Sequence, residues 1–182
     1  MPAAGWLRPQ LEAGVRYPTT PAGAINTYRN SRALALDLNR AEGRPLTGRP
    51  LKSMQDQIAR YLRGERTPSP ERTGALRRLA RRRIAGRSLE PYRNRGAFIH
   101  VKGRVLITIS EGRRIQRNVE FGRRVSPATI AAALDAAEDA MVAGRRSDWK
   151  RAEHATLVAA FKAYEETPFE EALSLDYVSI QP

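Results

Sequence analysis

The sequence contains no cysteine, so it forms no disulfide and offers no thiolate ligand to a metal ion. Its two histidines, His100 and His154, stand too far apart to form a metal-ligand pattern. No apolar run approaches the ~20 residues that a transmembrane helix needs, and the first residues lack the charged start and apolar run of a secretory signal. We therefore expect a cytoplasmic protein that carries no metal and no other cofactor.

Lysine is scarce in the first half of the chain, where Lys52 is the only one before residue 97. Residues 1–96 hold 20 basic and 7 acidic side chains, which accounts for the whole net charge of +13, whereas residues 97–182 hold 12 of each sign. The excess charge is almost entirely arginine, whose planar fork of donors matches pairs of phosphate oxygens or the edge of a guanine. We therefore expect the first half to bind a polyanion and the second half to have another task. Few large aromatic residues accompany the arginines, which favours nucleic acid over an acidic membrane surface.

The first part of the chain is predicted to be helical after a poorly structured lead-in over residues 1–30, where four prolines and three glycines interrupt any period. Residues 31–96 are predicted to form a basic helical unit. Its helices span Ser31–Ala41, with Ser31 as N-cap, about Leu51–Arg63, and about Glu71–Ile84. Nine residues separate the first two helices, more than the three or four of an orthodox helix-turn-helix motif. An ordinary three-helix bundle with solvated outer faces therefore remains an alternative.

The hydrophobic period changes to two after residue 96, which indicates β-structure. Apolar and polar residues alternate through Ala97–Ser110, Glu111-Gly112 predicts a turn, and a second alternating run follows. Two helices are then expected, over residues 126–144 and about 147–166, and the tail Leu173–Ile180 is predicted to be a closing strand. The expected fold class is α+β: a helix-turn-helix-like unit with an arginine-rich helix, then a β-hairpin, two helices and a β-strand.

Two groups of side chains are predicted to contact DNA. The outer face of the second helix carries polar groups that suit a recognition helix: Lys52, Ser53, Gln55, Arg60 and Arg63. The third helix contributes a cluster of arginines: Arg77, Arg78, Arg81, Arg82 and Arg83. No acidic residue lies within four positions of Arg81–Arg83, and uncompensated like charges repel unless a polyanion neutralises them. We therefore expect the affinity for DNA to fall steeply with salt.

The sequence contains no Gly-rich phosphate loop, no paired carboxylates in a suitable frame and no Ser/His/Asp arrangement. The acidic residues of the second half lie mostly on predicted helix faces, where solvation explains them. We therefore expect that the protein is not an enzyme.

Three segments, in this order, carry a resemblance to a known family. The first is residues 57–64 (Gln-Ile-Ala-Arg-Tyr-Leu-Arg-Gly), followed by a proline-containing break and the arginine-rich helix at residues 73–83. The second is the alternating strand Phe98–Ser110, and the third is the closing strand Ala172–Ile180. Together they resemble the terminal proteins that cap the telomeres of Streptomyces-type linear chromosomes and plasmids. The match covers most of the chain in order and size.

The resemblance implies protein-primed DNA synthesis. In this chemistry a DNA polymerase joins the first nucleotide to a protein hydroxyl, and the protein stays covalently attached to the 5′ end. The implied partners are the single-stranded or folded DNA at the ends of a linear replicon, a DNA polymerase and a telomere-associated protein, with no membrane. The implied location is the nucleoid. A homodimer through an edge strand remains open.

Residues 97–182 are expected to form an α+β unit for priming and protein contacts. The resemblance also indicates where in this unit the priming hydroxyl lies. Family members are linked through a threonine in or just after the segment that matches Phe98–Ser110. Here the turn is short and holds no threonine, which is a departure from the family. Ser110 at the hairpin tip is the first candidate for the priming hydroxyl, and Thr108 on the same strand face is the second.

Two further interpretations stay open at this point. The first is a helix-turn-helix regulator whose C-terminal α+β unit dimerises, which predicts a palindromic operator. The second is a packaging protein that only neutralises DNA, which predicts uniform binding. Neither gives the second half, whose net charge is zero, as clear a task as priming does.

Overall fold

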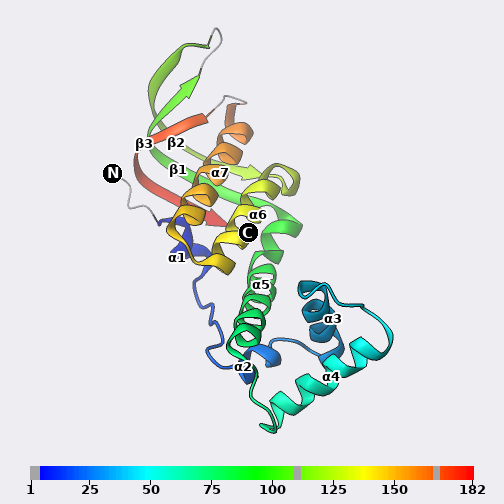
Figure 1. Cartoon of the computed structure of the whole chain (residues 1–182). Helices are drawn as coiled ribbons and strands as arrows, with labels where there is room; N and C mark the ends of the chain where they lie inside the picture. The colour runs from blue at the N-terminus through cyan, green and yellow to red at the C-terminus, as the bar shows by residue number, and fades with distance from the viewer. Residues whose placement is uncertain (1–4, 109–111, 166–168) are drawn as a thin grey trace. The chain divides into compact units, whose positions relative to one another are not determined.

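The computed structural model describes residues 5–108, 112–165 and 169–182. Over these residues the chain forms seven helices and one three-stranded antiparallel sheet (Figure 1), so the predicted α+β class is confirmed. The chain divides into two compact units, Val15–Ala85 and Met1–Gly14 together with Gly86–Pro182. This division differs from the predicted one, because it falls inside a helix and assigns the expected lead-in partly to each unit.

The unit Val15–Ala85 is built from α2 (Pro21–Asn26), α3 (Ser31–Ala41), α4 (Gly48–Leu62) and α5 (Pro70–Arg95) as far as Ala85. The N-cap of α3 is Asn30 and not Ser31, because the Asn30 side chain accepts a hydrogen bond from the Ala33 N–H at 2.7 Å. The core of the unit consists of apolar side chains from α2 to α5, the largest being Leu34, Leu38, Met54, Ile58 and Leu76.

Helix α4 begins at Gly48, three residues before the predicted start. The sequence pattern favoured a loop at Pro50, but a proline is tolerated in the first helical turn, where the backbone N–H groups lack intrahelical acceptors. The connection between α3 and α4 is therefore six residues long and not nine. It is still longer than the turn of an orthodox helix-turn-helix motif.

The expected lead-in contains two short helices, α1 (Leu7–Leu11) and α2. Leu7 and Leu11 are buried in α1, and Ile25 is buried in α2, so tertiary burial stabilises segments that the glycines and prolines interrupt. Proline even assists α2, because Thr20 caps it through a 3.0 Å bond from the Gly23 N–H and proline follows at the first position.

Helix α5 continues to Arg95, well past the predicted end near residue 84. Leu89 and Tyr92 are buried along this extension. Arg93 holds it to α6 (Pro127–Ala143) through ion pairs of 2.8 Å with both Asp135 and Glu138. These contacts offset the backbone hydrogen bond that Pro91 removes.

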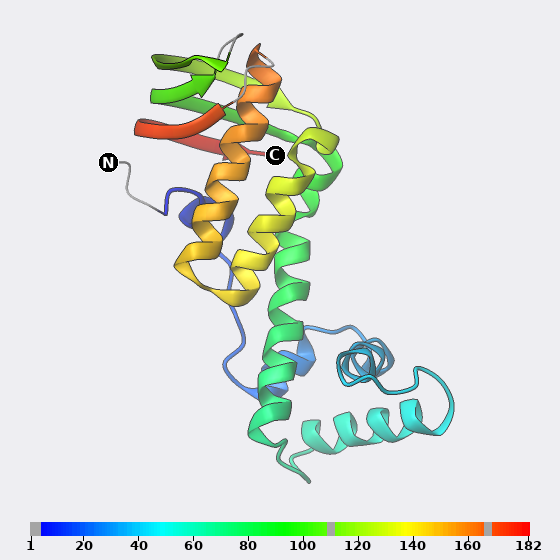
Figure 2. The same cartoon turned by 45° about the horizontal axis from the view of Figure 1, so that its top comes forward.

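The sheet has the strand order β2-β1-β3, formed by β1 (Ala97–Thr108), β2 (Arg114–Val125) and β3 (Phe169–Gln181). Both pairings are antiparallel, and the predicted hairpin places Ala97 opposite Val125 and Thr108 opposite Arg114. Figure 2 shows α6 and α7 (Arg146–Glu165) on one face of the sheet, the face to which the odd-numbered residues of β1 point.

One glycine explains how β3 approaches β1. A Cβ at Gly103 would collide with the carbonyl oxygen of Ser174, so only glycine permits this contact. The β1–β3 register shifts at this position and twice more before the strands part.

Candidate nucleic-acid interface

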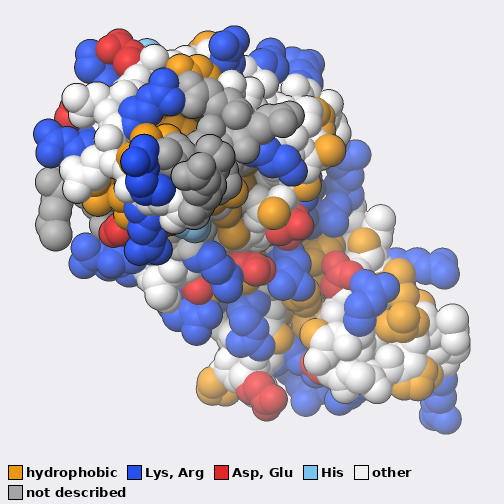
Figure 3. All heavy atoms as spheres, turned by 90° about the horizontal axis from the view of Figure 1, so that it is seen from above, with side chains coloured by type: hydrophobic (Ala, Val, Ile, Leu, Met, Phe, Trp, Pro, Cys, Tyr) orange, Lys and Arg blue, Asp and Glu red, His pale blue; other side chains and the backbone are white. Residues whose placement is uncertain are grey.

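Most of the net positive charge belongs to one structural unit, Val15–Ala85. This unit has 16 basic and 5 acidic side chains, whereas the remainder of the chain has 16 basic and 14 acidic ones. Figure 3 shows many Lys and Arg side chains on the visible surface and fewer Asp and Glu side chains among them. The two units have equal numbers of basic residues and differ in how many acidic residues accompany them. The uncompensated charge favours a polyanionic partner for Val15–Ala85.

The exposed face of α4 brings together four of the five residues that were predicted on it: Lys52, Ser53, Arg60 and Arg63. They lie opposite the buried residues Leu51, Met54 and Ile58, as the helical period requires. The fifth, Gln55, is half-buried at the border of this face.

One of these cations already has a carboxylate partner. Arg63 donates to Glu65 through Nη2–H at 3.0 Å, and this hydrogen bond holds the pKa of the Glu65 carboxyl below its usual range. Because both side chains are exposed, the pair is weak and a phosphate can compete for the guanidinium.

The five predicted arginines of α5 do not share one face. Arg77, Arg78 and Arg82 are exposed and Arg81 is half-buried beside them. At 100° per residue, Arg83 falls on the side of the helix that faces the core. The sequence pattern alone therefore grouped a core-facing arginine with four outward ones.

Two tyrosines far away in the sequence hold two of these arginines. The guanidinium of Arg81 lies 5.1 Å from the ring centre of Tyr17, and that of Arg83 lies 4.7 Å from the ring of Tyr28. Tyr28 is itself fixed, because its hydroxyl donates to Asp37 at 2.9 Å. Burial and this hydrogen bond raise the pKa of Tyr28 far above its usual value, so its hydroxyl stays neutral.

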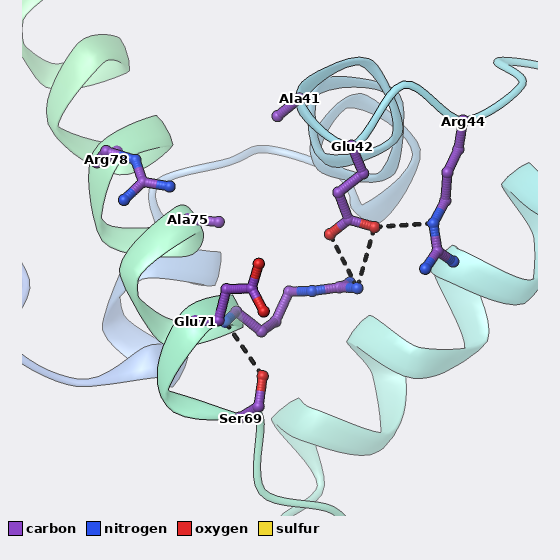
Figure 4. A pocket seen from close by; sticks show the side chains of 8 residues that line it. Ala41, Glu42, Arg44, Ser69, Glu71, Ala75 and Arg78 are labelled. Atoms are coloured by element: carbon purple, nitrogen blue, oxygen red, sulfur yellow. Dashed lines mark hydrogen bonds and ion pairs between the residues drawn. The ribbon is translucent and has the colours of Figure 1, made fainter.

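A cavity of about 390 Å³ lies between the end of α3 and the start of α5 (Figure 4). Glu42 stands on one side of it and accepts ion pairs from Arg44 at 3.0 Å and from Arg72 at 2.8 Å. This carboxylate therefore joins α3 to α5 and neutralises charge inside the unit. Arg78 extends from α5 toward the same cavity, and within the described part of the chain it makes no ion pair.

Only one of the two candidate priming hydroxyls, that of Thr108, lies in the part of the chain that the structure describes. Ser110 lies outside the described residues. Thr108 is the last residue of β1, and its half-buried hydroxyl donates to the carboxylate of Glu170 on β3. The Arg114 Nε lies 2.7 Å from the other oxygen of Glu170. The carboxylate is thus placed to accept the Thr108 proton, and the guanidinium stabilises its charge.

The sequence analysis did not predict the residues that contact Thr108 or the inner arginines of α5. Arg114 lies opposite Thr108 in the hairpin, so the register of the two strands places Arg114 near this hydroxyl. Glu170 carries no such signal, because it comes from a distant strand whose pairing with β1 shifts register three times. The same holds for Tyr17 and Tyr28, which reach α5 only through tertiary packing.

No family model matches the chain, and neither a curated protein nor a solved structure is significantly similar to it. Within residues 5–108, 112–165 and 169–182, no three His, Cys, Asp or Glu side chains gather into a group that suits a metal ion. A helix with the length and apolar character needed to cross a bilayer is absent from the same residues.

Proposed function

We propose that this protein binds the terminal DNA of a linear replicon and supplies a side-chain hydroxyl as primer for DNA synthesis. The observation that carries the DNA-binding part is the concentration of uncompensated arginine in Val15–Ala85. The exposed faces of α4 and α5 in this unit hold the phosphates. The priming part is supported by the resemblance of three segments to terminal proteins and by the Thr108 hydroxyl on Glu170.

In the proposed transfer, the hydroxyl oxygen attacks the α-phosphorus of a deoxynucleoside triphosphate bound by the polymerase. A phosphate ester forms, the bond to the β-phosphate breaks, and pyrophosphate leaves. When Thr108 is the nucleophile, its proton passes to the Glu170 carboxylate, with which it already shares a hydrogen bond. When Ser110 is the nucleophile, Glu170 has no assigned part.

The priming residue is tested by nucleotide transfer with the cognate polymerase and a labelled deoxynucleoside triphosphate. We expect Thr108→Ala together with Ser110→Ala to abolish labelling of the protein. Ser147→Ala is the matched control, because it removes an exposed hydroxyl at the start of α7. Glu170→Gln separates the candidates, since it slows transfer to Thr108 and leaves transfer to Ser110 unchanged. Full labelling of the double variant excludes both residues as the primer.

A DNA-binding regulator is a second candidate, favoured by the paired helices α3 and α4 in the basic unit. Protein purified from its host, digested with nuclease and measured by mass spectrometry distinguishes the two functions. A primer retains a nucleotide on a hydroxyl-bearing peptide. An unmodified protein with a sequence-specific footprint at an internal palindrome is instead a regulator. An unmodified protein that binds uniformly to DNA only packages it.

A further inference from the structure

The face of the β-sheet opposite α6 and α7, which no described helix covers, carries two exposed aromatic side chains. Helices α6 and α7 cover the opposite face, and the even-numbered residues of β1 point away from them (Figure 2). Phe98 on β1 is 43 % exposed and Tyr177 on β3 is 51 % exposed. They are two of the four large hydrophobic side chains that are exposed within the described residues. Scattered exposed apolar residues are ordinary, but two rings on one sheet face indicate a binding surface.

The two rings are held in place by their neighbours. His100 lies between them in the register, opposite Gly122 on β2 and Ser179 on β3. The rings of His100 and Tyr177 meet edge to face, with their centres 5.3 Å apart. The far end of the Phe98 ring lies over Gly122, where a Cβ would stand 2.7 Å from its Cζ atom. A side chain at position 122 would displace the Phe98 ring, so this glycine lets the ring lie on the sheet.

The border of this surface carries three basic and two acidic side chains. Arg124 lies opposite Phe98 on β2, and Lys102 and Arg104 follow along β1. Lys102 pairs with Glu120 at 2.9 Å, whereas Arg104 and Arg124 make no ion pair with any residue that the structure describes. A cavity of about 460 Å³ runs beside Lys102 and Arg104, and the carboxylates of Glu120 and Asp176 also line it. Aromatic rings next to unpaired guanidinium groups are complementary to bases attached to phosphates.

We propose that this surface, formed by Phe98, His100 and Tyr177 with Arg104 and Arg124 at its border, binds single-stranded nucleic acid by stacking its bases. Bases in a duplex already stack on one another, so the surface selects single strands. The inference goes beyond the proposed function, because it places a second nucleic-acid site in the unit that we expected to serve priming and protein contacts. It does not require that the protein be a primer.

The test compares the affinity of the full chain for a short oligothymidylate and for the same strand in a duplex, by fluorescence anisotropy. We expect Phe98→Ala together with Tyr177→Ala to raise the single-strand Kd about tenfold or more, because two stacked bases lose their partners. The duplex Kd should change less than about twofold, because the arginines of α4 and α5 remain. Circular dichroism and thermal unfolding verify that the double variant is folded.

Two further variants make the test specific to stacking. The control Phe98→Tyr together with Tyr177→Phe keeps both rings, and we expect it to retain the affinity of the wild type. Phe98→Trp places a fluorophore in the surface, and we expect oligothymidylate to quench the added emission while the duplex does not. A folded double alanine variant with an unchanged ratio of the two affinities overturns the proposal. So does a double alanine variant that loses only its complex with a protein partner, which would assign the surface to protein.

The outcome is separable from that of the proposed function. Quenching of the Phe98→Trp variant by single strands, in a protein that never acquires a nucleotide, supports this site and refutes priming. Nucleotide transfer with unchanged single-strand affinity in the double alanine variant supports priming and refutes this site.

Discussion

At the scale of single residues, the arginines of α5 divide into two roles that the sequence presents as one cluster. Arg72 is engaged by Glu42, and Arg83 lies on the core side against Tyr28. Arg78 and Arg82 are exposed and, as far as the structure describes the chain, make no ion pair. The sequence predicts the arginine-rich helix, but the tyrosine and the carboxylate that bind its inner arginines come from segments whose contacts only the tertiary structure defines.

The two roles predict that an Arg→Gln substitution lowers stability at one position and weakens DNA binding at the adjacent one. Arg83→Gln removes the guanidinium from the Tyr28 ring and loses the packing of its stem, so we expect the free energy of unfolding to fall by about 1–2 kcal/mol. Arg82→Gln should change it by less than about 0.5 kcal/mol and weaken binding to duplex DNA severalfold. Urea unfolding and anisotropy measure both quantities. Equal stability of the two variants contradicts this division of roles.

Glu153 predicts a pH dependence of stability. Its buried carboxylate accepts hydrogen bonds from the Gly5 N–H at 2.8 Å and the Leu7 N–H at 3.3 Å, yet burial raises the pKa of this carboxyl above its usual 4.5. A raised pKa in the folded state means that folding favours the protonated form, so ionisation at neutral pH is destabilising. We expect Glu153→Gln to be more stable than the wild type at neutral pH, by up to about 1 kcal/mol.

The advantage of Glu153→Gln should shrink as the pH falls through the raised pKa toward 4.5, because the wild-type carboxyl then becomes neutral too. Thermal unfolding across this range measures it. Glu120→Gln is the control of opposite sign, since Lys102 holds the pKa of Glu120 below its usual value and the ionised form is the stabilising one. Glu120→Gln should therefore lower stability at neutral pH. A Glu153→Gln advantage that is constant with pH refutes the role of ionisation.

At the scale of elements, the periodic segments and the ends marked by local chemistry are predictable, whereas the ends that depend on tertiary contacts are not. The alternation in β1 and the Ser126-Pro127 start of α6 identify these elements from local chemistry. The extension of α5 past residue 84 has no local signal, since Gly86 and Pro91 both disfavour a helix. It depends on burial of Leu89 and on ion pairs with α6, which are tertiary.

Gly96, between α5 and β1, predicts a large effect at an element boundary. Its φ is +75°, and a Cβ would collide with the carbonyl oxygen of Val125 at the end of β2. We expect Gly96→Ala to lower the free energy of unfolding by about 3 kcal/mol or more. Gly64→Ala is the matched control, because Gly64 has a φ of +73° and open space around it, and should cost about 1 kcal/mol. Urea unfolding of both variants measures the difference, and equal losses would show that the collision is relieved.

At the scale of the whole molecule, charge and structure divide the chain at different places. All the excess charge lies before residue 97, whereas the boundary between the compact units falls at Ala85. The two boundaries differ because residues 86–95, which are basic, belong to the unit of α6. Arg93 in this segment forms ion pairs with Asp135 and Glu138 of α6. The structural division leaves 16 basic and 5 acidic side chains in Val15–Ala85 and 16 basic and 14 acidic ones in the rest of the chain, so the inference that one part of the molecule binds the polyanion stays a prediction.

This boundary predicts which arginines control the salt dependence of DNA binding. Each phosphate that a variant no longer neutralises should flatten the slope of log affinity against log salt by about 0.9. Arg78→Gln with Arg82→Gln removes two exposed charges of Val15–Ala85, so we expect the slope to change by about two. Arg145→Gln with Arg151→Gln removes the same charge from the other unit, where these side chains pair with Asp148 at 2.8 Å and Asp139 at 3.6 Å.

The slope of this second double variant should stay within experimental error of the wild type, because the cations that it removes neutralised carboxylates and not phosphates. Anisotropy titrations of the two variants with one duplex over a range of salt concentrations decide the matter. Since both variants have the same net charge, a general attraction between protein and DNA changes the two slopes equally. Equal slopes would therefore refute a localised interface, whereas a flattened slope in the first variant alone would place the phosphate contacts on α5.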